Sequence, residues 1–216
     1  FGQFTFKTYV PDDNFENYLE ANSMGDGITL NDSVNTLSVE MLMSLDVSNE
    51  NISDLTGIED FTSLLMLKCY SNPLTSIDVS NNIYLTDLRC QSNQLTSLDV
   101  SQNTALNSLF FYSNFLIGID VSNNTALTYL YGHSNQLTSL DLSNNLALTV
   151  LHCSYNQLTF LDVSQNTALT HLHCNNNQLT SLDVSQNTAL TTLFFYSNFL
   201  IGIDVSNNTA LTYLYG

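Results

Sequence analysis

The sequence predicts a β-rich solenoid, in which short coils of one repeating pattern stack and each coil packs only against its neighbours. The first observation behind this prediction is a column of asparagines spaced by 21 residues. These asparagines are Asn72, Asn93, Asn114, Asn135, Asn156, Asn177 and Asn198. Aspartates keep the same step from Asp78 to Asp204, and leucines keep it from Leu85 to Leu211. A fixed period of this length is typical of a stacked repeat architecture.

The first half of each unit predicts a short strand. One unit, residues 85–105, reads LTDLRCQSNQLTSLDVSQNTA. Leu88 and Cys90 are two residues apart, so on an extended segment they lie on one side and Arg89 between them lies on the other. We therefore expect an inward Leu and Cys in every coil and a parallel sheet built from one strand per coil. Asn93 follows, where its amide can turn the chain and bond to backbone groups of neighbouring coils as a ladder.

The second half of the unit repeats the same frame. The segment LTSLDVSQN again has the form L-x-x-L-x-apolar-x-x-N, so each unit consists of two related halves. This similarity predicts that the L-D-V segments are also strand-like and face the sheet across a flattened coil. No repeat contains a helical pattern ten residues long.

The pattern L-x-x-L-x-C-x-x-N-x-L resembles that of bacterial leucine-rich-repeat proteins of a 21-residue, Cys-containing subclass. The resemblance covers residues 42–216 and implies a leucine-rich-repeat coil with a parallel strand sheet. The first unit, which contains SLDVSNENISDLTGIEDFTSL, is similar to internalin-type repeats. Such arrays are common on secreted and surface proteins of Bacteroidetes-type bacteria, so the resemblance implies an extracellular or cell-surface location. In this family the strand face is the usual surface for ligand contact.

The chain divides into two predicted parts. Residues 1–41 are expected to form an N-terminal cap with a short helix, because a solenoid otherwise exposes the apolar layer of its first coil. Pro11 and Asp12 are typical of a helix start, and Phe15 and Leu19 would share its apolar face.

Residues 42–216 are expected to form the solenoid of about eight coils, the last incomplete. The sequence starts at Phe1 without an initiator Met and stops within a strand segment at Gly216. We therefore expect a fragment of a longer chain, or self-association through the open C-terminal end.

The charge balance excludes several functions. The 216 residues contain 20 Asp and Glu against 3 Lys and Arg, which gives a formal net charge of −17. Nucleic-acid binding requires clustered Lys and Arg, and the last basic residue here is Arg89. No apolar run is long enough for membrane insertion. We predict no nucleic-acid partner and no membrane insertion.

Two columns could in principle carry chemistry. The four cysteines, Cys69, Cys90, Cys153 and Cys174, occupy an inward column, so buried free thiols are favoured over disulfides or a metal site. Phe111 and Gly132 replace Cys in this column, which suggests that their volumes compensate. The stacked aspartates repel one another. Hydrogen bonds from the flanking Ser and Thr are favoured as their partners, and calcium is the alternative.

The outward positions beside the Cys column form the candidate ligand-binding site, because Tyr is enriched at binding surfaces and an exposed apolar stripe needs a reason. They hold all four histidines and many aromatics. The candidate residues are Phe110, Tyr112, Tyr129, Tyr131, His133, His152, Tyr155, His171, His173, Phe194, Tyr196, Tyr213 and Tyr215. The alternative is that these side chains only stabilise the sheet through contacts between strands. The histidines could bind zinc or copper, but no metal site and no cofactor is predicted.

Two coils contain NFLIGID and so depart from the common NQLTSLD. Phe115 and Ile117, and later Phe199 and Ile201, therefore replace polar residues. These apolar replacements are either sites of self-association or drift copied during duplication, and drift is favoured.

No catalytic motif is present. The serines repeat in every coil, and no G-x-S-x-G turn or Gly-rich phosphate loop occurs. We predict a non-enzymatic extracellular recognition or adhesion module that binds a protein or glycan through its aromatic and histidine face. The alternatives are a structural repeat protein that stacks into fibres, and a non-catalytic domain of a larger exported protein.

Overall fold

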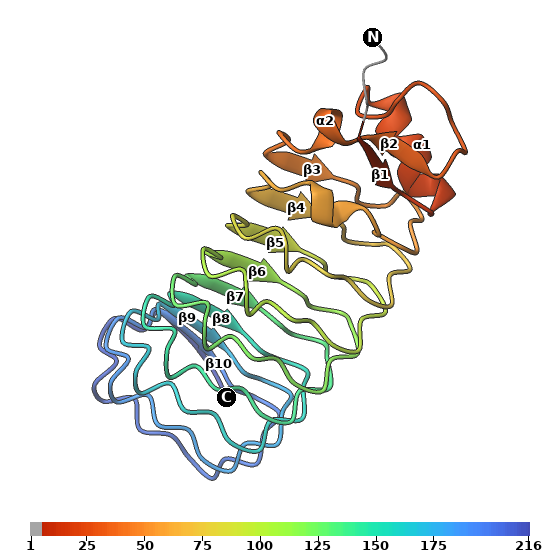
Figure 1. Ribbon diagram of the computed structural model, residues 1–216. Coiled ribbons are helices and arrows are strands. Elements are labelled where there is room, and N and C mark those ends of the chain that lie inside the picture. Colours follow the sequence, from red (N-terminus) through yellow and green to blue (C-terminus); the bar gives the residue numbers. More distant parts are fainter. Residues whose placement is uncertain (1–5) are drawn as a thin grey trace.

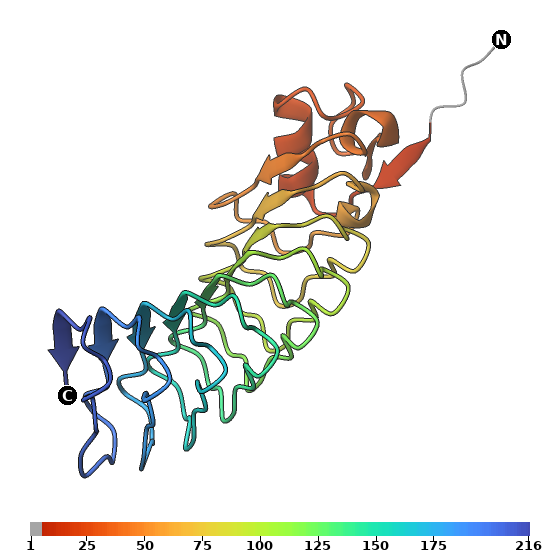
Figure 2. The same ribbon diagram turned by 90° about the vertical axis from the view of Figure 1, so that its left-hand side faces the viewer.

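The computed structural model describes residues 6–216, which form a curved stack of coils (Figure 1). Nine parallel strands make one sheet in which the strands follow the order of the chain, with one strand per coil. The strands are β3 (Ser44–Asp46), β4 (Met66–Lys68), β5 (Asp87–Arg89), β6 (Ser108–Phe110), β7 (Tyr129–Tyr131), β8 (Val150–His152), β9 (His171–His173), β10 (Thr192–Phe194) and β11 (Tyr213–Tyr215). Figure 2 shows these strands along the inner side of the curve. The predicted β-rich solenoid is confirmed.

The N-terminal end of the stack contains the helices. They are α1 (Asp13–Ala21), α2 (Thr36–Val39) and a 3₁₀ helix, η1 (Ile58–Asp60). Strands β1 (Lys7–Tyr9) and β2 (Ser33–Asn35) pair antiparallel beside them, an element that the sequence did not predict. The division at residues 41 and 42 stays a prediction.

Helix α1 is fixed to the first coil by its cap and its apolar face. The Asp12 carboxylate accepts hydrogen bonds from the backbone N–H of Asn14 and Phe15, each at 3.0 Å, as an N-cap should. Its second oxygen accepts the N–H of Ser53 in the first coil at 2.8 Å. Phe15 is fully buried, and its ring lies 6.1 Å from that of Phe61. The predicted helix is therefore present, and it covers the first coil.

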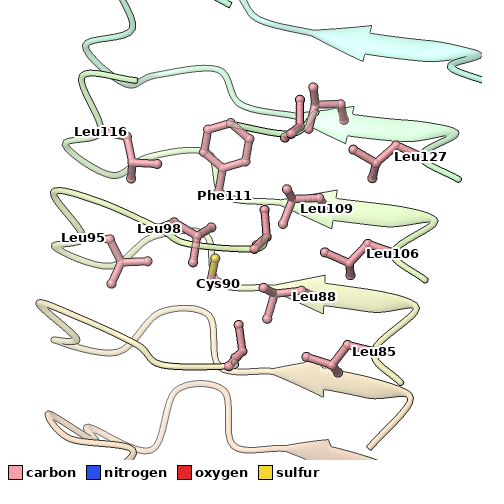
Figure 3. Packing of buried hydrophobic residues seen from close by; sticks show 14 of the residues in the cluster. Leu85, Leu88, Cys90, Leu95, Leu98, Leu106, Leu109, Phe111, Leu116 and Leu127 are labelled. Atoms are coloured by element: carbon pink, nitrogen blue, oxygen red, sulfur yellow. The ribbon is translucent and has the colours of Figure 1, made fainter. Parts of the chain in front are cut away.

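Inward leucines from both halves of each coil form one continuous core (Figure 3). Leu85 and Leu88 come from the strand side, and Leu95 and Leu98 come from the second half of the same coil. The residue opposite each strand leucine is the leucine of the next strand, as in the pair Leu88 and Leu109. All four cysteines are free and buried in this core, as the sequence predicted.

The Asn column forms the predicted ladder. The Asn93 side-chain Nδ2 donates to the carbonyl oxygens of Cys69 at 3.0 Å and Cys90 at 2.9 Å. Its Oδ1 accepts the N–H of Leu74 at 3.2 Å. Each asparagine therefore bonds to its own coil and to the preceding one, which satisfies backbone groups at a turn that would otherwise be buried without partners.

A second Asn ladder runs along the other half of the coils, because the second half of each unit also ends in Asn. Asn103 Nδ2 donates to the carbonyls of Val79 and Asn82, both at 2.9 Å. Asn124 repeats this contact with Val100 at 3.0 Å and Asn103 at 2.9 Å.

The L-D-V segments keep the predicted alternation, with Leu98 and Val100 buried and Asp99 exposed, but they form no second sheet in the described structure. No strand is present at Leu98–Val100 or at the equivalent segments of other coils. The Val100 carbonyl accepts the N–H of Asn103 in a turn and the side chain of Asn124, so it is not used for pairing with a neighbouring segment. On this side of the coil, hydrogen bonds from asparagine side chains therefore connect neighbouring coils in place of the backbone pairing of a second sheet.

Candidate functional site

A line of aromatic rings runs along the sheet surface from β6 to β11. The second outward residue of each strand contributes one ring, and the parallel register places each ring beside the next. The centroid distances are 4.7 Å for Phe110–Tyr131, 5.9 Å for Tyr131–His152, 4.8 Å for His152–His173, 4.3 Å for His173–Phe194 and 4.9 Å for Phe194–Tyr215. We call these six residues the ring line. It is unbroken over six consecutive strands.

Tyr112 and His133 add a shorter second line beside the first. Their rings stack with centroids 4.3 Å apart and an interplanar angle of 14°. The ring of His133 also lies 4.1 Å from that of His152, which joins the two lines. His133 therefore lies diagonal to His152 across neighbouring coils.

The first outward residues of the strands flank the ring line, and in β7, β9 and β11 they are more open to solvent. Tyr129 is 42% exposed and Tyr213 is 59% exposed, and His171 is also exposed. Tyr196 follows β10 and is exposed as well. None of the candidate residues lies in the core, although ring contacts keep those of the ring line from β6 to β10 half-buried.

Tyr155 differs from the other candidates in its position. Ser154 occupies the place that Tyr112 and His133 hold in earlier coils, and its hydroxyl donates to Asn175 Oδ1 at 2.8 Å in a buried contact. Tyr155 lies one residue later, at a left-handed turn with φ of 54°, and its side chain is 55% exposed. This backbone conformation is unusual for a bulky residue. Tyr155 therefore lies at the edge of the strand face.

The histidines of the two lines are neutral at physiological pH. Burial among the rings, with neighbouring histidines as a smaller cause, lowers the pKa of His152 to about 3. Burial followed by the proximity of His173 also lowers the pKa of His133, and burial followed by the proximity of His171 lowers that of His173. The ring line is consequently an uncharged surface on a strongly acidic protein.

Charged residues cover the same face at its N-terminal end. The Arg89 guanidinium lies 4.9 Å from the ring centroid of Phe110, so a cation–π contact extends the ring line by one strand. Three hydrogen bonds to Asp87, from Nε at 2.9 and 3.3 Å and from Nη2 at 2.8 Å, hold this guanidinium in place. Arg89 is not among the candidate residues predicted from the sequence, although its 21-residue spacing from Phe110 indicates the contact.

The histidines do not converge as a set of metal ligands. Among residues 6–216, only Asp13, Glu16 and Asp32 form a group of three or more His, Cys, Asp or Glu side chains with all ligand atoms within 4.8 Å of one another. The Glu16 carboxylate already accepts the N–H of Asn31 at 2.9 Å and that of Asp32 at 3.2 Å. Its role there is to fix the loop that follows α1.

On the other side of the coils, each aspartate of the column from Asp78 to Asp204 accepts a hydrogen bond from the serine two residues later. Asp99 Oδ1 accepts the N–H of Ser101 at 2.9 Å, and the same bond recurs in the other coils at 2.8–2.9 Å. Hydrogen bonds from the Ser101 backbone and hydroxyl lower the pKa of Asp99, against the opposing effect of Asp120. Hydrogen bonding by the flanking serine, which the sequence favoured, is therefore confirmed.

The repeated coil, the Asn ladder and the parallel sheet define a leucine-rich-repeat protein. The family described as Leucine Rich repeats (2 copies) matches residues 146–187. Internalin J of Listeria monocytogenes is 41% identical over 78 residues, which are 36% of this chain and 8% of that protein.

Solved structures show the same architecture over nearly the whole chain. The functional domain of InlJ from Listeria monocytogenes, described as including a cysteine ladder, is 41% identical with a TM-score of 0.90, over 97% of this chain and 47% of that one. The internalin inlF of the same species is 23% identical with a TM-score of 0.74, over 95% and 69% of the two chains, and shows the fold alone. The chain is an internalin-like bacterial leucine-rich-repeat protein, and it spans about half the length of the InlJ domain that it matches.

No helix within residues 6–216 has the length and apolar character needed to cross a bilayer.

Proposed function

We propose that this chain is a non-enzymatic recognition module of an extracellular or cell-surface protein, and that it binds its ligand through the ring line and the flanking tyrosines. Internalin-like leucine-rich-repeat domains generally mediate protein recognition or adhesion. The observation that carries the proposal is the ring line itself, an uncharged aromatic surface across six strands on the inner side of the curve. Aromatic residues are enriched at the centres of protein interfaces.

The packing of the rings favours a protein over a glycan as the ligand. Phe110 and Tyr131 lie nearly parallel with an interplanar angle of 11°, and His173 and Phe194 do so with an angle of 9°. Stacking covers one face of each ring in these pairs, and the Arg89 guanidinium also lies over the Phe110 ring, so fewer ring faces are free for a ligand. A sugar that stacks on an aromatic side chain needs a free face, whereas a protein surface can pack against edges, hydroxyls and imidazole nitrogens.

Binding by this surface is tested with a triple variant, Tyr129→Ser, Tyr131→Ser and His152→Ser. Arrays of proteins and of glycans are probed with the parent chain to find a ligand, and the variant is then measured against it. We expect the variant to lose binding by at least tenfold, since three central contacts are removed. The control, Phe115→Gln with Ile117→Thr, restores common repeat residues away from the strands and should bind like the parent.

Equal binding by the parent and a folded triple variant would contradict the proposal. Circular dichroism and the thermal midpoint establish that each variant folds. Antibody labelling of intact cells tests the proposed location, and labelling that requires lysis would contradict it.

Self-association is a second candidate function, favoured by four exposed apolar side chains. Phe115 and Ile117 are 50% and 66% exposed, Phe199 is 68% exposed, and Ile201 is fully exposed. Light scattering and electron microscopy of the isolated chain test whether these residues join copies. A monodisperse monomer at high concentration would exclude this candidate.

A further inference from the structure

A hollow lies between two adjacent coils on the side away from the strands. Its volume is about 370 Å³. The lining residues are Thr138, Ser139, Leu140, Asp141, Leu142, Ser143, Thr159, Phe160, Asp162 and Gln165. None of these residues belongs to the ring line, so the hollow is a separate feature from the surface proposed above.

Phe160 creates the hollow because it breaks the repeat at this position. The two coils before it and the two coils after it all have a small residue there, namely Gly118, Ser139, Ser181 and Gly202. The large Phe160 side chain therefore lies next to the small Ser139 of the preceding coil, and both line the hollow. Phe160 is 66% exposed, and its ring contacts no other aromatic ring in the described structure. The Phe160 ring is therefore largely open to solvent, unlike the half-buried rings of the ring line from β6 to β10.

Two carboxylates flank the ring. Asp141 Oδ1 accepts the N–H of Ser143 at 2.9 Å, and Asp162 Oδ1 accepts that of Ser164 at 2.8 Å. An ionised carboxylate offers two acceptor oxygens, so each of these groups can accept further hydrogen bonds beside those from its serine. Hydrogen bonds from these serines also lower the pKa of both groups, so both are ionised at neutral pH.

The chain supplies no cation to these carboxylates. The described ion pairs join Lys7 to Asp26, Lys68 to Asp46 and Arg89 to Asp87, all near the N-terminal end. No Lys or Arg follows Arg89 in the sequence. Neighbouring aspartates of the column oppose the ionisation of Asp162 through mutual repulsion, so a bound cation would relieve an unfavourable interaction.

We infer that this hollow binds an arginine side chain of a protein partner. A guanidinium can stack on the exposed ring of Phe160 while its N–H groups donate to Asp141 and Asp162, because it is planar and carries its donors in a fixed fork. The hydroxyls of Thr138 and Thr159 at the rim are further acceptors. A neutral sugar is the competing occupant, since it can also stack on a free ring. The two carboxylates have no Lys or Arg partner within residues 6–216, which favours the cation.

The inference is tested by titrating the isotope-labelled chain with the peptide acetyl-Gly-Arg-Gly-amide and following its amide NMR signals. A matched peptide carries citrulline, which has nearly the shape of arginine without the charge. We expect the arginine peptide to shift signals of residues 138–165 at millimolar concentrations, with weaker binding as salt is raised. The citrulline peptide and N-acetylglucosamine should shift them far less.

Two single variants locate the contact. Phe160→Ser restores the residue of the neighbouring coils at an exposed position, so it should fold like the parent and bind about five- to tenfold more weakly. Asp162→Asn keeps the shape of the side chain and should weaken binding by a similar factor. The triple variant of the strand face should bind the peptide like the parent, which separates this test from that of the proposed function.

Several results would overturn the inference. They are an absence of shifts with the arginine peptide, equal shifts with citrulline or with the sugar, and unchanged affinity in Phe160→Ser. Shifts that spread along the whole aspartate column without a maximum at residues 138–165 would indicate general attraction of a cation and would also overturn it.

Discussion

At the scale of single residues, the buried asparagines connect one coil to the next. Asn156 Nδ2 donates to the carbonyls of Gly132 and Cys153, both at 3.0 Å, and its Oδ1 accepts the N–H of Leu137 at 2.9 Å. These backbone groups lie at a turn where no strand partner reaches them. The Asn156 amide therefore pairs with these backbone groups, as a neighbouring strand would in a sheet. A residue without both a donor and an acceptor cannot replace it.

We predict that Asn156→Ala lowers the free energy of unfolding by about 2–4 kcal/mol, because it leaves buried donors and acceptors unpaired. Denaturant titration followed by circular dichroism measures the change. The matched control is Gln157→Ala at the adjacent exposed position, which should change the free energy by less than about 0.5 kcal/mol. Similar values for the two variants would show that the ladder contributes little.

His152 gives the protein a predictable response to acid. The pKa of His152 is about 3 in the folded chain, against an ordinary value of 6.5, which we take for the unfolded chain. The unfolded chain therefore takes up a proton at this residue at a higher pH than the folded chain does. The contribution of this group to stability is therefore complete above pH 6.5 and is lost as the pH falls from 6.5 toward 3.

We expect the thermal midpoint to fall as the pH is lowered from about 7 to about 5, a range above the pKa values of the aspartates. His152→Gln should make this slope smaller because it removes a titrating group. Calorimetry at several pH values measures the slope, and NMR titration of the His152 ring checks its pKa directly. An unchanged slope in the variant would contradict the assignment.

At the scale of one coil and the next, side-chain volumes are matched across the stack. Phe111 is fully buried, and a Cβ added to Gly132 in the following coil would lie 2.3 Å from its ring. Phe195 and Gly216 repeat this arrangement. The volume compensation that the sequence suggested is therefore present as direct contact. Because the other four of the eight positions from 69 to 216 in this column are Cys, each Phe–Gly pair replaces two Cys residues as a unit.

We predict that Gly132→Ala alone destabilises the protein by about 1–3 kcal/mol through overpacking. Phe111→Cys alone should cost about 3–5 kcal/mol because it leaves a cavity. The double variant Phe111→Cys with Gly132→Cys restores two common repeat residues. It should lose less stability than the sum of the losses in its two single variants. A double-mutant cycle from denaturant titrations measures this coupling, and strict additivity would exclude it.

At the scale of the whole molecule, unpaired negative charge opposes the compact stack. The net charge is −17, and the described ion pairs use only three of the acidic residues. We predict that sodium chloride raises the thermal midpoint by screening this repulsion, with most of the effect below about 0.5 M. Calcium chloride at the same ionic strength should give a similar rise. A clearly larger rise with calcium would show that the aspartate column binds this ion.

Much of the architecture could be predicted from the sequence because the period itself is a structural constraint. The alternation of side chains along a strand predicts that Leu and Cys point inward and that Tyr and His point outward. The fixed step between coils predicts the Asn ladder. The neighbours in the ring line follow in the same way, since residues 21 apart lie side by side, as with His152 and His173.

Features that depend on three-dimensional detail could not be predicted. The second half of the coil has the same sequence pattern as the first, but its carbonyls are occupied by turn and side-chain bonds, as at Val100. Tyr155 lies one residue away from its expected column, at a turn. The hollow beside Phe160 depends on the relative size of residues in adjacent coils, which periodicity does not reveal.

The fixed step between coils also affects how such a gene can change its length. Segments 109–132 and 193–216 are identical and lie 84 residues apart (193 minus 109), which is four steps of 21. Unequal recombination between the two DNA copies would add or remove whole turns in frame. The leucines, asparagines and outward rings of every inserted coil would keep the register of the stack. Solenoids of different length could therefore arise in a single genetic event and still fold in the same way.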